Sequence, residues 1–323
     1  MDKLEKIKNS RLELKHILVL WFLTIPIISA AIIILVIYFG YWYVVLAYLL
    51  YIFYESRSGL GAKAPNKHRN SFLFNITKEY FDLKIVKTAD IPPTKNYIFC
   101  YHPHGIVPFG MYSALYSNSC GFDDLYPGIS LSLKVHSFFF TFPLVREFCL
   151  YFGGQHASKE SIVETLSKTG NSVGISVGGG AEMIYSVPNT AKLVIKNRFG
   201  FVKIALETGS DLVPMYAFGE TDTYSQSPTQ VLQNTNFFVP YITGRGIFPN
   251  TKGIFPHSVP IRIVIGKPIN VEKAPNPSIE QIKDLHEKYC SELEALYNQY
   301  KDEFWYDPDS SPPKIELLGN PLK

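Results

Sequence analysis

The longest uncharged stretch of the chain limits what its N-terminal part can form. No Asp, Glu, Lys, Arg or His occurs within Ile17–Tyr54. One helix of that length would measure about 57 Å, whereas the hydrocarbon core of a bilayer is about 30 Å thick. A signal peptide has an apolar segment of only about 7–15 residues. The stretch therefore predicts a membrane helical hairpin, with Pro26 in its first arm and its turn near Gly40. A helical hairpin of a soluble core is the alternative.

Basic residues on both sides of this stretch predict its orientation. Segment 1–16 is net basic, and further basic residues follow the apolar stretch, namely Arg57, Lys63, Lys67, His68 and Arg69. Basic flanks favour the cytosolic side, so both ends of the hairpin are expected there. The predicted organisation is a basic cytosolic arm (1–16), a membrane hairpin (17–54), a cytosolic globular domain (71–306) and a C-terminal tail (307–323). Two full passes and a shallow re-entrant hairpin both fit the pattern.

Composition narrows the class of the globular part. A net charge of +3 in 323 residues is too small to indicate nucleic-acid binding. The four cysteines, Cys100, Cys120, Cys149 and Cys290, are scattered and form no C-x-x-C pair. This spacing argues against a disulfide scaffold and a metal site, and it fits a reducing compartment. Aromatic residues make up 15% of the chain, a content that suits membrane interfaces.

The globular part alternates predicted strands and helices, which indicates an α/β fold with a mixed sheet flanked by helices. The clearest helix begins at the capping box Ser278-Ile-Glu-Gln281 and continues to Phe304 with apolar residues at helical spacing. The predicted strands are Ile98–Tyr101, Val173–Val177, Asp211–Phe218 and, as the last one, Ile261–Ile265. The other predicted helices are Val107–Tyr116, Ser158–Lys168 and Phe201–Thr208. The Phe-rich segment Leu131–Phe152 fits either a core or the wall of an acyl-chain tunnel.

Two histidines flank a proline at the end of the first predicted strand. Pro103 biases His102 towards an extended conformation, and side chains two residues apart in an extended chain share a side. We therefore expect His102 and His104 to face one cleft, with Gly105 permitting a sharp turn. Histidine exchanges protons near neutral pH, which predicts acid–base chemistry at this point. A solvated or hydrogen-bonded histidine is the ordinary alternative.

A glycine triplet and a glutamate follow the next predicted strand. Gly178, Gly179 and Gly180 permit close approach to backbone amides, which suit an anionic group or an oxyanion. Glu182 lies just beyond and is placed to orient a histidine or bind a hydroxyl. A plain turn and a surface glutamate are the alternatives. The triplet is not a P-loop, because no Lys-Ser/Thr pair follows it.

Separated motifs occur in order along the chain: Tyr101-His-Pro-His-Gly105, Val177-Gly-Gly-Gly-Ala-Glu182, Arg198-Phe-Gly-Phe-Val-Lys-Ile-Ala-Leu206, Asp211-Leu-Val-Pro214, Phe218-Gly-Glu220 and Gly266-Lys-Pro-Ile269. Together they closely resemble the type 2 diacylglycerol acyltransferase family, which includes monoacylglycerol and wax-alcohol acyltransferases. The resemblance runs from about residue 15 to residue 305. It implies a glycerolipid-acyltransferase-like sheet and a transmembrane hairpin in the endoplasmic-reticulum membrane, with access to lipid droplets.

The resemblance also implies the reaction. A lipid hydroxyl, that of diacylglycerol, would be acylated from acyl-coenzyme A to give triacylglycerol, with acyl-coenzyme A as co-substrate and no further cofactor. A general base must take the hydroxyl proton. We expect His104 in that role, His102 shaping or sharing the site, and Glu182 orienting His104. The predicted substrate-binding residues are Gly105, Gly178, Gly179, Gly180, Arg198 and Lys203, the last two within a basic set that also holds Lys192 and Lys196.

The sequence departs from the wider glycerolipid acyltransferases at one motif, and several other functions are alternatives. The wider glycerolipid acyltransferases carry H-x-x-x-x-D, but Val107 and Phe109 stand five residues after the two histidines. Glu182 is therefore expected to replace that Asp. Monoacylglycerol, a long-chain alcohol and a retinoid are alternative acceptors, and a non-catalytic membrane protein that binds lipid is the alternative from another class. A soluble α/β hydrolase is the disfavoured third alternative, although its G-x-S-x-G pattern does occur, as Gly174-Ile-Ser-Val-Gly178. A homo-oligomer is compatible with the sequence.

Overall fold

A computed structural model describes residues 21–54, 69–226, 242–246, 248, 251–305, 307 and 310–320. The predicted basic arm (1–16) lies outside these residues. So does most of the basic segment expected after the hairpin, of which Arg69 alone is described.

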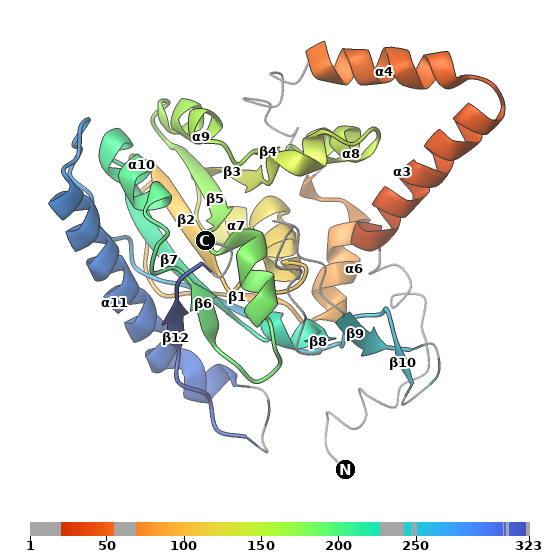
Figure 1. Ribbon diagram of the computed structural model, residues 1–323. Coiled ribbons are helices and arrows are strands. Elements are labelled where there is room, and N and C mark those ends of the chain that lie inside the picture. Colours follow the sequence, from red (N-terminus) through yellow and green to blue (C-terminus); the bar gives the residue numbers. More distant parts are fainter. Residues whose placement is uncertain are drawn as a thin grey trace.

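A mixed seven-stranded sheet forms the centre of the globular domain (Figure 1). In order across the sheet its strands are β1 (Lys84–Lys87), β11 (Arg262–Ile265), β7 (Asp211–Phe218), β2 (Tyr97–His102), β5 (Asn171–Ser176), β3 (Ser130–Val135) and β4 (Gln155–His156). The strands from β7 to β4 run parallel to one another, whereas β11 pairs with β7 antiparallel and with β1 in parallel. The predicted α/β class with a mixed sheet is confirmed.

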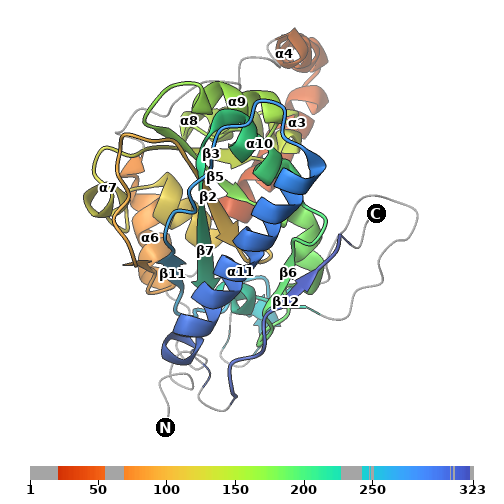
Figure 2. The same ribbon diagram turned by 90° about the vertical axis from the view of Figure 1, so that its left-hand side faces the viewer.

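Helices cover both faces of the sheet, which makes three layers (Figure 2). One core lies under α6 (Phe72–Tyr80), the π-helical η2 (Met111–Tyr116) and α7 (Phe122–Leu125). The other lies under α9 (Lys159–Leu166), α10 (Gly200–Thr208) and α11 (Ile279–Phe304). Strand β2 serves both cores, because successive side chains of a strand point to opposite faces: Phe99 and Tyr101 enter the first, Ile98 and Cys100 the second.

Local signals predicted most of these elements. Strand β7 has the bounds expected from the sequence, and the Ser278 hydroxyl caps α11 by accepting a hydrogen bond from the Gln281 N–H. The helix expected from Val107 begins only at Phe109, since the preceding residues form a turn. Strand β11 is not the last one. The segment expected as a tail contains β12 (Glu316–Leu318), which pairs in parallel with β6 (Lys192–Val194).

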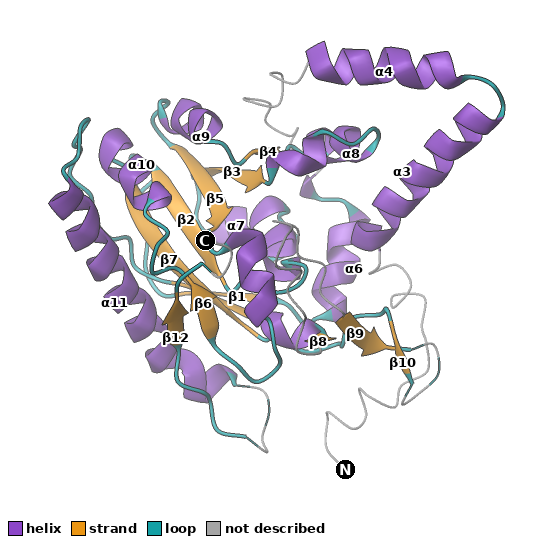
Figure 3. Cartoon of the chain, in the orientation of Figure 1, coloured by secondary structure: helices purple, strands orange, loops and turns teal. Residues whose placement is uncertain are grey.

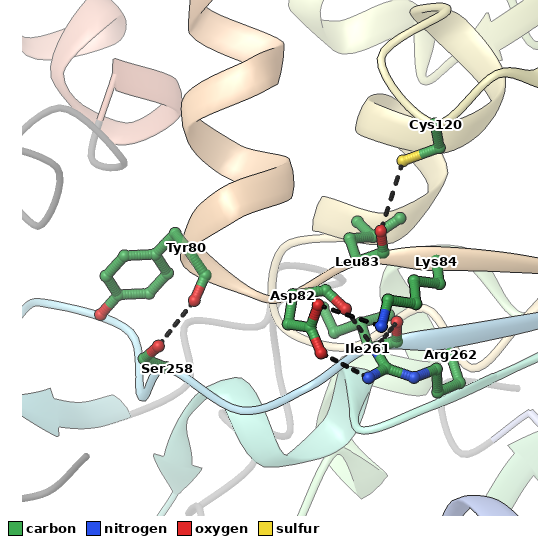
Figure 4. A network of polar contacts seen from close by, with 8 residues as sticks. All are labelled: Tyr80, Asp82, Leu83, Lys84, Cys120, Ser258, Ile261 and Arg262. Atoms are coloured by element: carbon green, nitrogen blue, oxygen red, sulfur yellow. Dashed lines mark hydrogen bonds and ion pairs between the residues drawn. The ribbon is translucent and has the colours of Figure 1, made fainter. Parts of the chain in front are cut away.

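Shorter elements connect the layers and surround the sheet edge. They are η3 (Ser137–Phe140), α8 (Val145–Tyr151), η4 (Gly179–Tyr185), η5 (Glu220–Thr223), β8 (Ser225–Gln226), β9 (Ile242–Arg245) and β10 (Lys252–Gly253). Polar contacts tie the end of α6 to the segment leading into β11 (Figure 4): the Ser258 hydroxyl donates to the Tyr80 carbonyl at 2.6 Å, and Arg262 forms an ion pair with Asp82 at 2.5 Å.

Two apolar helices, α3 (Trp21–Tyr38) and α4 (Trp42–Tyr54), project from the domain (Figure 1). They join at the expected turn, where Gly40 adopts a φ of +84°. Their side chains are largely exposed, with Ile27 at 68% and Leu50 at 61%. Among the helices of the described residues, none meets the combined length and hydropathy expected of a membrane span.

Candidate active site

Three neighbouring parallel strands end at one edge of the sheet, and each leads into one of the polar motifs (Figure 3). Tyr101 near the end of β2 lies opposite Ser176 of β5 on one side and Met215 of β7 on the other. The His-Pro-His segment, the glycine triplet and the Gly219-Glu220 pair therefore meet at the carboxyl ends of adjacent strands. In open α/β sheets this crevice is the usual place for a ligand.

The His104 ring has a defined tautomer. Its Nδ1 lies 2.9 Å from the Gly105 carbonyl oxygen, which can only accept a hydrogen bond, so Nδ1 carries the proton and Nε2 keeps its lone pair. Within the described part of the chain, Nε2 has no hydrogen-bond partner. Burial lowers the pKa of His104, and the bond to the Gly105 carbonyl only partly opposes this. The imidazole is therefore neutral at pH 7 and able to accept a proton.

Glu182 hydrogen-bonds to the backbone of His104 and not to its ring. One carboxylate oxygen accepts the N–H of His104 at 2.6 Å, and the other accepts the N–H of Val194 at 2.8 Å. The side chain is 1% exposed. Burial raises the pKa of Glu182 to about 7 against the opposing effect of the two N–H groups and of Arg198. Glu182 thus joins the His-Pro-His segment to β6 through backbone N–H groups, and its role in orienting the His104 imidazole stays a prediction.

His102 lies in different surroundings from His104. Its side chain is fully buried, and its Nε2 is 3.1 Å from the Tyr289 hydroxyl of α11. Its Nδ1 is buried without a hydrogen-bond partner among the described residues. Burial lowers the pKa of His102 to about 3, so this ring stays neutral. The sequence did not indicate Tyr289 as a neighbour, because the two residues are 187 positions apart.

The glycine triplet packs around the Glu182 side chain. Gly178 has an ordinary helical φ of −68°, but a Cβ there would overlap the Glu182 carboxylate and stand 2.8 Å from the Glu182 Cβ. Gly179 needs glycine for another reason, a φ of +56°. A Cβ on Gly180 would meet nothing within 4 Å. The triplet begins the short helix η4, whose first N–H groups have no partner within the helix, which keeps them candidates for binding an oxyanion.

The predicted basic set is split by the fold. Arg198 lies at the site, where its Nη2 donates to the Gly178 carbonyl at 3.1 Å and its Nε is buried without a hydrogen-bond partner in the described residues. Lys203 is exposed on α10, and its amine is 4.0 Å from the Glu207 carboxylate. Lys192 is half-buried and Lys196 exposed. Arg198 is therefore the member of the set that touches the glycine triplet.

A second buried carboxyl, that of Glu220, lies beside the Gly105 turn, and sequence analysis did not predict a role for it. The Glu220 side chain is fully buried, and its Oε2 accepts hydrogen bonds from the Tyr101 hydroxyl and, at 3.0 Å, from the Gly110 N–H. Its Oε1 has no partner among the described residues. Burial raises the pKa of Glu220 to about 8. A Cβ on Gly105 would touch the Glu220 Cγ at 3.0 Å, so this turn needs glycine both for its φ of +67° and for space.

Comparison with known proteins places the chain in a family. Residues 34–311 match the family model described as diacylglycerol acyltransferase. Diacylglycerol O-acyltransferase 1 of Schizosaccharomyces pombe is 37% identical over 277 residues, which cover 82% of this chain and 80% of that protein. 2-acylglycerol O-acyltransferase 1 of Mus musculus is 38% identical over 303 residues (88% and 90%). Acyl-CoA wax alcohol acyltransferase 2 of Homo sapiens is 34% identical over 284 residues (84% and 85%).

Among solved structures, the 1-acyl-sn-glycerophosphate acyltransferase of Thermotoga maritima is similar with a TM-score of 0.44 and 13% identity, over 89% of this chain and 97% of that one. The glycerolipid-acyltransferase-like form of the sheet stays a prediction at that similarity. The family itself rests on the sequence matches over most of the chain. The chain belongs to the diacylglycerol acyltransferase family.

Proposed function

We propose that this chain transfers a fatty acyl group from acyl-coenzyme A to the free hydroxyl of diacylglycerol, forming triacylglycerol. The observation that carries the proposal is the state of His104, whose Nδ1 proton is held by the Gly105 carbonyl and whose Nε2 lone pair has no partner in the described residues. A thioester is already activated, but a lipid hydroxyl is a weak nucleophile at neutral pH. A neutral histidine supplies the missing base.

Acyl transfer proceeds by direct attack on the thioester. The hydroxyl oxygen attacks the thioester carbonyl carbon while His104 Nε2 takes the hydroxyl proton. The tetrahedral oxyanion collapses, the carbon–sulfur bond breaks, and the imidazolium returns the proton to the departing thiolate. Direct attack of the hydroxyl needs no acyl-enzyme. Burial raises the pKa of all four cysteine thiols, which disfavours a cysteine thiolate as an alternative nucleophile.

The surrounding groups support this step. Glu182 fixes the backbone of His104 and thereby its position. The N–H groups of Gly178, Gly179 and Gly180 are the candidates for binding the oxyanion. Arg198, held at the triplet by its bond to the Gly178 carbonyl, is positioned to meet a phosphate of coenzyme A, with Lys203 as a more distant and exposed helper.

We also propose that α3 and α4 insert into the endoplasmic-reticulum membrane, with the catalytic domain in the cytosol and access to lipid-droplet surfaces. The uncharged stretch Ile17–Tyr54 and the exposed apolar side chains of both helices support this. Helix α4 has 13 residues, or about 20 Å at 1.5 Å per residue. The hydrocarbon core is about 30 Å thick, and Tyr54 is the last residue described before position 69, so a hairpin through one leaflet and two full passes both fit the described helices.

The test uses microsomes that contain the wild-type chain, His104→Ala or the control Lys288→Ala, which changes an exposed residue of α11, at matched abundance. Labelled oleoyl-coenzyme A is supplied with diacylglycerol, 2-monoacylglycerol or hexadecanol. We expect triacylglycerol from wild type and the control, and a loss of about 10²–10⁴-fold in His104→Ala, the usual contribution of general acid–base catalysis. If diacylglycerol or wax ester were the main product, the acceptor would be monoacylglycerol or a long-chain alcohol and not diacylglycerol. Equal activity of His104→Ala and wild type would remove His104 as the base.

A further inference from the structure

An exposed aromatic cluster follows β3. Four side chains of η3, α8 and their connection are 40–55% exposed: Phe138, Phe139, Phe142 and Tyr151. We call this set the aromatic face. Phe138 contacts Phe142 and Phe139 edge-on, with ring centroids 4.6 and 6.1 Å apart. Three of the four rings therefore form one surface cluster.

Other rings of the same segment point inward and hold it in place. Phe140 stacks on His156 of β4 with centroids 4.1 Å apart. Phe148 and Phe152 contact each other at 4.7 Å, and Phe152 packs on Phe74 of α6. The segment is thus anchored by one set of aromatic rings while it presents another to the outside. Contiguous exposed apolar surface of this kind marks an interaction site.

The aromatic face is continuous with the apolar hairpin. The Leu144 N–H donates to the Tyr48 hydroxyl of α4 at 3.3 Å, and the Arg146 guanidinium lies 5.5 Å from the centre of the Tyr51 ring. Arg146 is 4% exposed and paired with Glu147 at 2.6 Å, so its charge is covered. Figure 1 shows α8 between the sheet and the two hairpin helices. A largely apolar surface, which also holds the partly exposed Glu147 carboxylate, therefore extends from α4 onto η3 and α8.

The aromatic face also borders the candidate active site. Strand β3 is parallel to β5, so η3 leaves the sheet at the same carboxyl edge as the His102–His104 segment. The order β2-β5-β3 separates β3 from β2 by two strand spacings, or about 10 Å.

We propose that the aromatic face inserts into the membrane beside the hairpin, as a second membrane contact. This contact would hold the carboxyl edge of the sheet, with His104, at the depth of a diacylglycerol hydroxyl. The inference rests on the membrane location proposed above and adds the surface that delivers the acceptor. Tyr rings are enriched at the boundary between headgroups and hydrocarbon, and Phe is among the side chains that interfacial elements bury there. Diacylglycerol keeps its acyl chains in the hydrocarbon and its hydroxyl at this boundary. The acyl chains would lie against the aromatic face, and the hydroxyl would lie near His104.

The first experiment identifies what touches the aromatic face. A benzoylphenylalanine photo-crosslinker replaces Phe139, Leu50 of α4 or Ile279 in the full chain, reconstituted in phosphatidylcholine vesicles with labelled acyl chains. Ile279 is 67% exposed at the start of α11 and serves as the control. We expect lipid adducts from positions 50 and 139 and none from position 279. Adducts from position 50 alone would overturn this inference and leave the hairpin in the membrane. No adduct from position 50 would overturn the membrane location itself. A crosslink from position 139 to a second copy of the chain would make the face a protein interface.

The second experiment measures delivery of the acceptor. The double variant Phe139→Ser, Phe142→Ser keeps the hairpin and the catalytic residues, so it remains in the membrane. In vesicles we expect its KM for diacylglycerol to rise about tenfold, from the weakened apolar contact of two rings, with kcat and the KM for acyl-coenzyme A within about twofold of wild type. In detergent micelles, where the acceptor is not confined to a bilayer, the two proteins should agree. An unchanged KM in vesicles would refute the delivery role.

Discussion

Alanine at position 178 is expected to disturb the site by displacing Glu182, without changing the His104 side chain itself. The backbone of Gly178 accepts any residue, but a Cβ there overlaps the Glu182 carboxylate. Glu182 must then leave the N–H groups of His104 and Val194. Hydrogen bonds to a charged group contribute about 1.5–3 kcal/mol each. After partial relaxation we expect a loss of about 3 kcal/mol in the free energy of unfolding, or roughly 6 °C in Tm.

The matched control is Gly180→Ala, because a Cβ there meets nothing within 4 Å. Both variants keep the backbone N–H groups proposed to bind the oxyanion. A difference between them therefore reports the packing around Glu182 and not the loss of an N–H donor. Thermal unfolding in detergent and acyl transfer in microsomes are measured together. We expect Gly178→Ala to lose stability and about 100-fold in activity, as a catalytic group displaced by about 1 Å does, and Gly180→Ala to keep its stability. If the two variants unfold at the same temperature, the proposed packing of Glu182 is wrong.

Two further predictions follow from other buried residues. The pKa of Glu220 is raised to about 8, so the folded state keeps a proton that the unfolded chain releases near pH 4.5. The free energy of unfolding should therefore fall as the pH rises from about 4.5 to 8 and then level off. In Glu220→Gln, chemical denaturation should show a smaller fall over this range, and an unchanged fall would contradict the assignment. Ile315, 5% exposed just before β12, should cost about 2–4 kcal/mol as Ile315→Ala, whereas the exposed Ile279→Ala should be neutral; equal urea midpoints would show that the C-terminal strand does not stabilise the domain.

Local patterns were sufficient for much of the chain. Apolar periodicity and a capping box located α11, and a continuous apolar run located β7, because both depend on residues close in sequence. The turn of the hairpin at Gly40 followed from the same kind of signal. The strand β12 was missed, since three residues among prolines carry no strand pattern and pair only because β6 offers an edge.

What the sequence determined about the site was its composition and its place. The histidine pair stands at the end of β2, the glycine triplet and Glu182 follow β5, and parallel neighbours bring such positions to one edge. Only the tertiary structure decided which atoms meet there. Glu182 binds the backbone of His104 rather than its ring, and Glu220 reaches Tyr101 across 119 positions of chain. These contacts depend on strand order and helix packing, which bring together residues that no local pattern relates.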